Sequence, residues 1–355
     1  EISLGLVGSE MCIRDREKML IKDPNYFNEK VFEDLSRKHD VYGFNYTLIK
    51  NGVASKTKAY GLKNNSPEEK MSSNTIFEAA SLTKSLFATL VLRFIDRGLF
   101  TLDDPISKLA PEIVITKDKR IEEVTIRQIL SHASGLPNWG SKPNLEFLFN
   151  PGTDFSYSGE GYYFLQKILE RLTSKDFCSH FYDEFIRPLS MDNSTPVWEP
   201  SILENESHTF SDDGKAIELR NCIDTSGNAP EPNAAWSLYS GAEDYSKFML
   251  EILNHQGHLS SNMYDEMVSP QSQATEHVFW GLGFGIPVRD QNVIWHWGDN
   301  GGYKHLAVMD VKTKDGMCIF TNGFNGIDLS TEFLDLVTDS TFTEDIAYFI
   351  EIGEK

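Results

Sequence analysis

The sequence predicts a mixed α/β (α+β) protein, in which one antiparallel sheet is built from both chain termini and flanked by helices, with an all-helical lobe inserted. Two groups of short, strand-like segments carry this prediction, one at residues 41–61 and one at residues 279–322. Segments with helical periodicity occupy most of the chain between them. Because strands joined by tight turns pair antiparallel, the two groups are expected to complete one sheet.

The N-terminal group of strands is centred on Asn51-Gly52, the dipeptide that most strongly indicates a tight hairpin. Apolar and polar residues alternate on both sides of it. This part of the chain is expected to form a helix over residues 17–39, strands over 41–49 and 53–61, a polar loop over 64–74 and a short strand over 75–79.

The helices of the inserted lobe are predicted from apolar positions that recur with the helical period. They are expected over residues 81–98, 125–132, 160–187 and 243–254. The C-terminal part is expected to form strands over 279–288, 293–298, 303–311 and 316–322, followed by a helix over 330–350. A single domain over 17–355 would then have a sheet lobe of about 17–80 and 275–355 and a helical lobe of about 81–274.

The composition excludes several classes of function. A formal net charge of −20 and a pI near 4.8 are unsuited to nucleic-acid binding, which needs clustered lysine and arginine. No apolar run reaches the roughly 20 residues that span a bilayer, so no transmembrane segment is predicted. The four cysteines are scattered and no His-Glu-x-x-His motif occurs, so neither a metal site nor a cofactor is predicted.

The first residues do not resemble natural protein. Residues 11–16 (MCIRDR) are what one reading frame of a sequencing-transposon end would encode. We therefore expect residues 1–16 to be a non-native, adapter-encoded segment. The native start, the cell compartment and the oligomeric state stay open.

A candidate nucleophile lies where the strand over 75–79 runs into the next helix. Ser81 and Lys84 are three residues apart, which places both side chains on one face of a helix. Serine becomes nucleophilic when a neighbouring base takes its proton, and a buried lysine can be that base. A serine that only caps the helix is the alternative. A lone lysine inside an otherwise apolar helix favours the catalytic interpretation.

Four sequence blocks occur in a recognisable order. They are FEAASLTK at 77–84 with GL at 98–99 and LDDP at 102–105, ILSHASGLP at 129–137, PGTDFSYSG at 151–159 and HWG at 296–298. Together they resemble the penicillin-recognising serine hydrolases, and within these the class C β-lactamase-like branch, which includes D-amino-acid peptidases and family VIII esterases. The resemblance runs from about residue 41 to residue 322.

The resemblance implies a role for each matching residue. Ser81 would be the nucleophile, Lys84 its base, and Tyr157 the group that passes the proton toward the leaving group, which requires Lys84 to lower the tyrosine pKa. The backbone N–H groups of Ser81 and Asp299 would form an oxyanion hole.

The third block would supply the edge of the site. His296 would occupy a place often held by lysine, and Gly298 would let the substrate approach the strand. Trp297 and Trp236 are candidates for the wall of the acyl pocket, with a plain core position as the alternative. His132 is expected to be structural.

Two departures from the family pattern bear on the substrate. Gly159 stands where β-lactamases of this branch carry an asparagine that contacts the amide of the substrate, and His296 replaces a lysine that anchors a carboxylate. The resemblance implies a serine hydrolase that forms an acyl-enzyme with a small-molecule acyl substrate. Both departures favour small carboxylic esters as that substrate. A β-lactamase or D,D-peptidase, and a catalytically silent binding protein of this fold, are the alternatives.

Overall fold

The computed structural model describes residues 21–22, 29–113, 116–140, 145–210, 214–217, 231–255, 259–339 and 342–353. The segment expected to be adapter-encoded lies outside the described residues. So do residues 17–20 and 23–28 of the predicted N-terminal helix.

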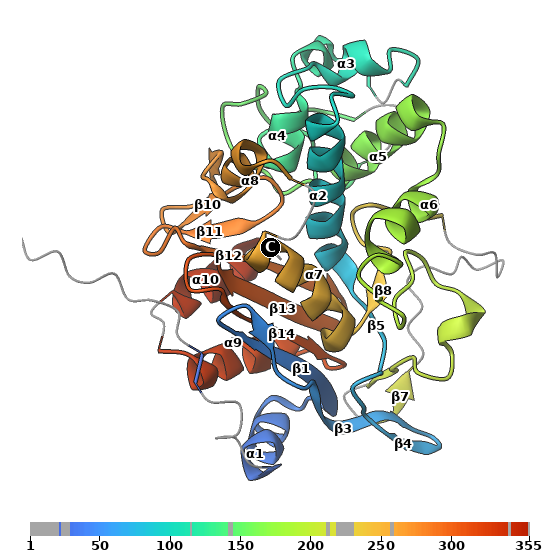
Figure 1. Ribbon diagram of the computed structural model, residues 1–355, viewed down its shortest axis with the longest axis vertical. Coiled ribbons are helices and arrows are strands. Elements are labelled where there is room, and N and C mark those ends of the chain that lie inside the picture. Colours follow the sequence, from blue (N-terminus) through green and yellow to red (C-terminus); the bar gives the residue numbers. More distant parts are fainter. Residues whose placement is uncertain are drawn as a thin grey trace, which may run out of the picture.

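One antiparallel sheet forms the centre of the molecule (Figure 1). From edge to edge its strands are β4 (Glu68–Lys70), β3 (Lys58–Asn65), β1 (Gly43–Lys50), β14 (Asp315–Thr321), β13 (Tyr303–Asp310), β12 (Val293–Asn300), β11 (Gly285–Pro287), β10 (Val278–Trp280) and β9 (Ser272–Gln273), with β2 (Val53–Ala54) paired to β1. The two ends of the chain meet where β1 pairs with β14, with Tyr46 opposite Ile319. The fold class predicted from the sequence is confirmed.

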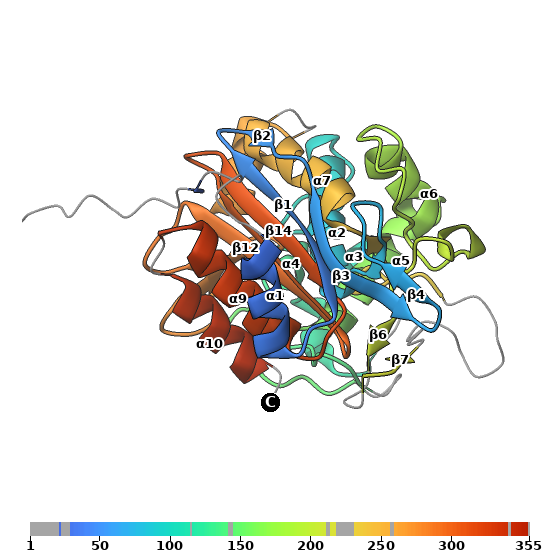
Figure 2. The same ribbon diagram turned by 90° about the horizontal axis from the view of Figure 1, so that it is seen from below.

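Helices cover both faces of this sheet (Figure 2). The helices α1 (Glu29–His39), α9 (Gly326–Val337) and α10 (Thr343–Gly353) lie on one face, and α7 (Ala242–Asn254) and α2 (Thr83–Asp96) lie on the other. The other helices are α3 (Ile106–Leu109), α4 (Ile126–Leu130), α5 (Gly159–Thr173), α6 (Phe177–Phe181) and α8 (Ser261–Val268). Short helical turns span Ala80–Leu82, Lys119–Glu122, Tyr182–Ile186 and Pro200–Ile202. Two small two-stranded sheets pair β5 (Phe77–Glu78) with β8 (Tyr239–Ser240) and β6 (Thr209–Phe210) with β7 (Ala216–Ile217).

Four segments that the sequence predicts as single elements are each divided in two, namely 53–61, 160–187, 279–288 and 330–350. Local chemistry explains the breaks. Ser174 ends α5 in a left-handed conformation, and the Asp176 side chain then caps the start of α6. Gly283, with a φ of 94°, turns the chain between β10 and β11. Periodicity alone does not register such short interruptions.

Apolar side chains on the two faces of the sheet form two cores. Phe44, Tyr46 and Leu48 of β1 pack toward α1 and α9, whereas Ile49 belongs to the larger core around α2. Every residue of α2 from 83 to 93 is buried. A helix enclosed on all sides cannot shift against the sheet without breaking close packing, so its first residues hold a fixed position beside the strands.

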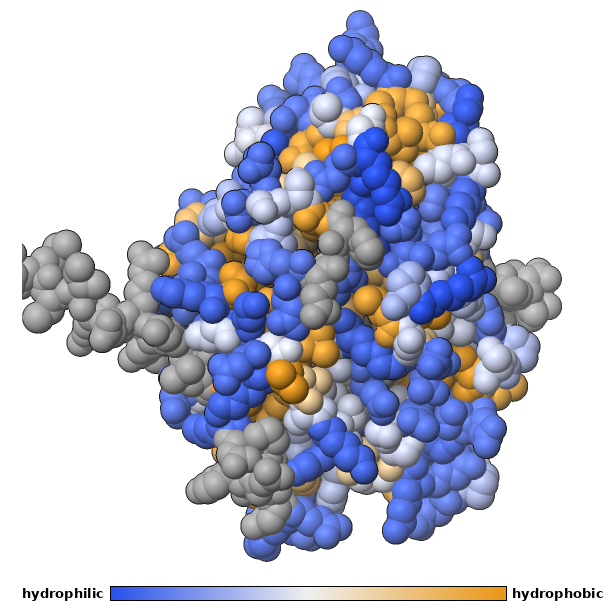
Figure 3. Space-filling view, in the orientation of Figure 1, coloured by the Kyte–Doolittle hydropathy of each residue, from blue (hydrophilic) through white to orange (hydrophobic). Residues whose placement is uncertain are grey.

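The surface agrees with the acidic composition. Hydrophilic side chains predominate on the face shown in Figure 3. No helix among the described residues is long and apolar enough to span a membrane.

A buried ion pair anchors the C-terminal half of α2. The Arg93 side chain is fully buried, and it binds the carboxylate of Glu251 on α7 and the carbonyl and carboxylate of Glu184. Arg97, which directly follows the last residue of α2, also binds Glu184, but its side chain is 46% exposed. Removing one partner from a buried pair leaves the other charge without compensation, whereas an exposed pair contributes little.

We therefore expect Arg93→Met to lower the free energy of unfolding by about 3–5 kcal/mol, measured by urea denaturation. The matched variant Arg97→Ala should cost at most about 1 kcal/mol. Equal losses in the two variants would show that the buried arginine does not anchor α2.

Candidate active site

The proposed nucleophile lies on a strained turn. Ala80, directly before Ser81, has a φ of 49°, a left-handed conformation that residues other than glycine seldom adopt. The Thr83 hydroxyl holds this turn, because it donates to the Ala80 carbonyl at 2.6 Å and accepts from the Leu238 N–H at 3.1 Å. Strain of this kind is typical of functional sites, where the surrounding structure holds a side chain in position.

Lys84 lies directly against Ser81. Its Nζ is 3.1 Å from the Ser81 Oγ and donates a second hydrogen bond to the Ala235 carbonyl at 2.8 Å. The side chain is buried, and it forms no ion pair with a carboxylate in the described part of the chain. Burial therefore lowers the pKa of Lys84 from 10.5 to about 7, so a large share of the amine is neutral near neutral pH.

Tyr157 stands on the other side of the lysine. The Lys84 Nζ is 4.7 Å from the centre of the Tyr157 ring. Burial of the phenol raises the pKa of Tyr157, and a hydrogen bond with Ser81 offsets only part of this rise. The expectation that Lys84 would lower the tyrosine pKa is therefore wrong: the protonated phenol is the resting form.

His132 fixes the segment that carries Tyr157. Its Nδ1 accepts from the Ser158 N–H at 3.0 Å, its carbonyl accepts from the Ser156 N–H at 2.9 Å, and its ring centre is 4.3 Å from that of Tyr157. His132 is fully buried with a φ of 57°. His132, which the sequence predicts to be structural, thus binds the backbone N–H groups on both sides of Tyr157.

The strand β12 runs beside the nucleophile turn. A Cβ atom on Gly298 would lie 2.4 Å from the carbonyl oxygen of Ala79, so only glycine allows the strand to pass this close. Asp299 follows at the end of the strand. Its carboxylate is held by Lys304 at 2.6 Å and by the Gly301 N–H at 2.9 Å, which fixes the orientation of the chain there.

His296 does not lie at the edge of the site. Its side chain is buried among aromatic rings, with the ring centres of Trp280 and Tyr157 at 5.5 and 6.2 Å. Burial, and then the nearby Lys84 charge, lower the pKa of His296 to about 3. The neutral ring shares its Nδ1 proton with the Trp297 carbonyl at 2.7 Å and cannot act as a charged carboxylate anchor.

A cavity of about 190 Å³ opens onto these groups. It is lined by Ser81, Lys84, Asn138, Trp139, Tyr157, Trp236, Trp297, Asp299 and Asn300. The structure thus brings six of the eight site residues expected from the sequence to one cavity, whereas His296 and Gly298 are not among its lining residues. Asn138, Trp139 and Asn300 were missed. Their only signal in the sequence is that they directly follow two of the matched blocks.

Trp139 occupies the space next to Gly159. A Cβ atom on residue 159 would lie 2.5 Å from the Trp139 indole. The exposed indole therefore covers the position where β-lactamases of this branch are expected to carry their asparagine side chain.

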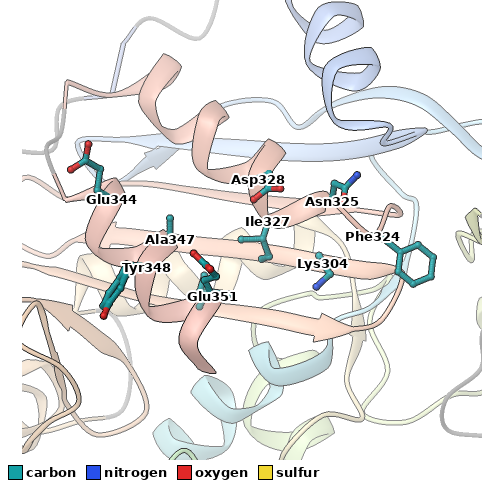
Figure 4. A pocket seen from close by; sticks show the side chains of 10 residues that line it. Lys304, Phe324, Asn325, Ile327, Asp328, Glu344, Ala347, Tyr348 and Glu351 are labelled. Carbon is teal, nitrogen blue, oxygen red and sulfur yellow. The ribbon is translucent and has the colours of Figure 1, made fainter. Parts of the chain in front are cut away.

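A larger cavity, of about 610 Å³, lies between α9 and α10 (Figure 4). It contains none of the proposed catalytic side chains. Lys304 is the link between the two cavities, because it lines the larger one and binds Asp299 in the smaller one. Among the described residues, no group of three His, Cys, Asp or Glu side chains could hold a metal ion.

A serine and a lysine at the start of a buried helix, beside a tyrosine and a strand of an antiparallel sheet, define a penicillin-recognising serine hydrolase fold. The profile of the Beta-lactamase family matches residues 28–337, so the chain belongs to this family. The resemblance to the penicillin-recognising serine hydrolases found in the sequence is confirmed.

Known relatives are distant. Protein flp of Staphylococcus aureus is 23% identical over 317 residues, which is 81% of this chain and 61% of that protein. D-alanyl-D-alanine-carboxypeptidase/endopeptidase AmpH of Escherichia coli is 22% identical and covers 88% of this chain and 91% of its own length. A solved class C β-lactamase superposes with a TM-score of 0.71 at 16% identity, covering 85% of this chain and 92% of that one. The chain spans less than two thirds of the length of the flp protein.

We expect Gly298→Ala to lower the free energy of unfolding by about 1–3 kcal/mol, because the new Cβ must push β12 away from the backbone of the nucleophile turn. Chemical denaturation checks this. An unchanged stability would mean that the strand and the turn are not in the close contact on which the site depends.

Proposed function

We propose that the chain is a serine hydrolase that forms an acyl-enzyme on Ser81 and hydrolyses small, neutral carboxylic esters. The observation that carries the proposal is the 3.1 Å contact between the Ser81 hydroxyl and the Lys84 amine, whose pKa burial lowers to about 7. A neutral amine at this position can accept the serine proton, and a serine hydroxyl needs such a base to attack a carbonyl.

The first step forms the acyl-enzyme. Lys84 takes the Ser81 proton, the Oγ attacks the ester carbonyl, and the negative charge moves to the carbonyl oxygen. The N–H groups of Ser81 and Asp299 are proposed to bind this oxyanion, each worth roughly 2.7–4 kcal/mol in comparable sites. When the C–O bond breaks, the Tyr157 phenol donates a proton to the leaving alkoxide and regains one from Lys84.

The second step releases the acid. A water molecule gives up a proton to the neutral lysine and attacks the acyl carbonyl along the same path. The tetrahedral intermediate then collapses, and the Ser81 oxygen leaves and recovers its proton. A phenol that rests protonated suits a proton donor and relay better than a primary base, so Lys84 is assigned the role of base.

The lining of the cavity supports a neutral substrate. Two basic residues on β12 and β13 could bind a substrate carboxylate, but neither offers a free positive charge. His296 on β12 is buried and neutral, and Lys304 on β13 is paired with Asp299. Three tryptophans, Trp139, Trp236 and Trp297, supply apolar wall. A small ester without charge suits this cavity.

Hydrolysis of β-lactams or D-alanyl peptides is the second candidate. The name of the AmpH relative, with which the chain shares almost the full length of both proteins, favours it. A catalytically silent binding protein is the third. The grouping of Ser81, Lys84 and Tyr157 in one cavity argues against it, because a site without function is free to lose any of the three.

We expect the purified protein to hydrolyse p-nitrophenyl butyrate with a kcat/KM at least tenfold above that for a chromogenic cephalosporin, and to be labelled by a fluorophosphonate probe. The Ser81→Ala variant should lose both ester hydrolysis and labelling by the probe, because it lacks the nucleophile.

A preference for the cephalosporin would favour the β-lactamase alternative. An unlabelled wild-type protein that is indistinguishable from Ser81→Ala would instead establish a silent binding protein. The Asn150→Asp variant, which changes an exposed side chain outside the cavity, serves as the control for handling and folding.

A further inference from the structure

Asp299 and Lys304 face each other across the hairpin of β12 and β13 (Figure 4). The Lys304 Nζ is 2.6 Å from the Asp299 Oδ2, and the two side chains are 13% and 22% exposed. The Gly301 N–H, in the turn of the hairpin, donates to the Asp299 Oδ1 at 2.9 Å. Both oxygens of the carboxylate are therefore bound, and the side chain is held against the turn.

The pairing of the strands fixes the direction of the Asp299 N–H. The Lys304 carbonyl accepts a hydrogen bond from the Thr321 hydroxyl of β14 at 2.7 Å, so the backbone groups of Lys304 face β14. Asp299 and Lys304 are then a non-hydrogen-bonded pair, the kind whose side chains lie closest together. The two-residue turn at 301–302 gives the same alternation. The Asp299 N–H therefore points away from β13, which suits a donor to an oxyanion.

The Asp299 carboxylate would oppose catalysis if it stood alone. Its carbon is three covalent bonds from the nitrogen that is proposed to bind the oxyanion, and Asp299 lines the same cavity as Ser81. A carboxylate charge this close to a developing negative charge raises the energy of the transition state, the more so where protein excludes water. The Lys304 ammonium, in direct contact with the carboxylate, offsets this repulsion.

We propose that Lys304 is a positioning residue that acts through Asp299: it neutralises the carboxylate and holds it against the turn, so that the Asp299 N–H can bind the oxyanion. This rests on the proposed function and deepens it. Lys304 is not among the residues that line the cavity of Ser81. Because the oxyanion forms only after Ser81 attacks, the contribution of Lys304 falls on kcat and not on KM.

Variants of the pair test the proposal, with p-nitrophenyl butyrate as the substrate. We expect Lys304→Met, which removes the charge, to lower kcat at least about tenfold and to change KM less than about threefold. Lys304→Arg, which keeps the charge, should retain kcat within about threefold. Adding Asp299→Asn to Lys304→Met removes the uncompensated charge and keeps an oxygen for the Gly301 N–H. This double variant should be at least about threefold more active than Lys304→Met.

The matched control is Lys247→Met. Lys247 forms an ion pair of the same length, 2.6 Å, with Asp244 on α7, and neither residue lines the cavity. Loss of this pair should leave kcat within about twofold of the wild-type value. The melting temperature and the amount of Ser81 labelled by a fluorophosphonate report the folded fraction of each variant.

A folded Lys304→Met variant with unchanged kcat, a loss confined to KM, or a double variant no more active than Lys304→Met would overturn the role of Lys304 and leave the esterase proposal intact. So would unfolding of both Lys304→Met and Lys304→Gln, because the pair would then serve folding alone. A wild-type protein that hydrolyses no ester and leaves Ser81 unlabelled would overturn the proposed function and the inference together.

Discussion

The contact between the Lys84 amine and the Ser81 hydroxyl is the interaction on which the rest of the structure depends. A lysine in an apolar interior is costly when charged, and no carboxylate among the described residues compensates it. The protein resolves this cost by lowering the pKa of the group to about 7, and not by supplying a counter-charge. An ion pair would stabilise the charge but would remove the base.

Much of the fold serves to keep this amine buried and in place. The helix α2 is enclosed on all sides, and Arg93 fixes its far end through charges that are paired with each other rather than with the lysine. Gly298 allows β12 to pack directly against the nucleophile turn, and His132 forms hydrogen bonds with the backbone around Tyr157. Each of these contacts joins segments that are distant in the sequence, so the site exists only in the folded protein.

The sequence predicts the parts of this arrangement that depend on local chemistry. The Asn51-Gly52 turn, the apolar stripe of α2 and the three-residue spacing of Ser81 and Lys84 are local patterns, and each is found as expected. Tyr157 and Asp299 are not predicted from a local pattern; the order of the matched blocks along the chain points to them. The helix breaks at Ser174 and Asp176 were missed because one left-handed residue and one cap barely alter the period of a long segment.

What the sequence does not predict are properties that depend on three-dimensional burial. His296 is in the expected strand, but the aromatic rings packed around it make it a neutral, enclosed group. The direction of the Tyr157 pKa shift has the same origin. The place of Trp139 over Gly159 depends on how a loop returns to the start of α5, which no periodicity or motif encodes.

The most direct measurement is the titration of Lys84 itself, by NMR of protein carrying ¹³C-labelled lysine, with the Lys84→Arg variant used to assign its Cε resonance. We expect this resonance to titrate near pH 7 in the folded protein, with the neutral form increasing as the pH rises. A titration near the ordinary lysine value of 10.5 would contradict a neutral base beside Ser81.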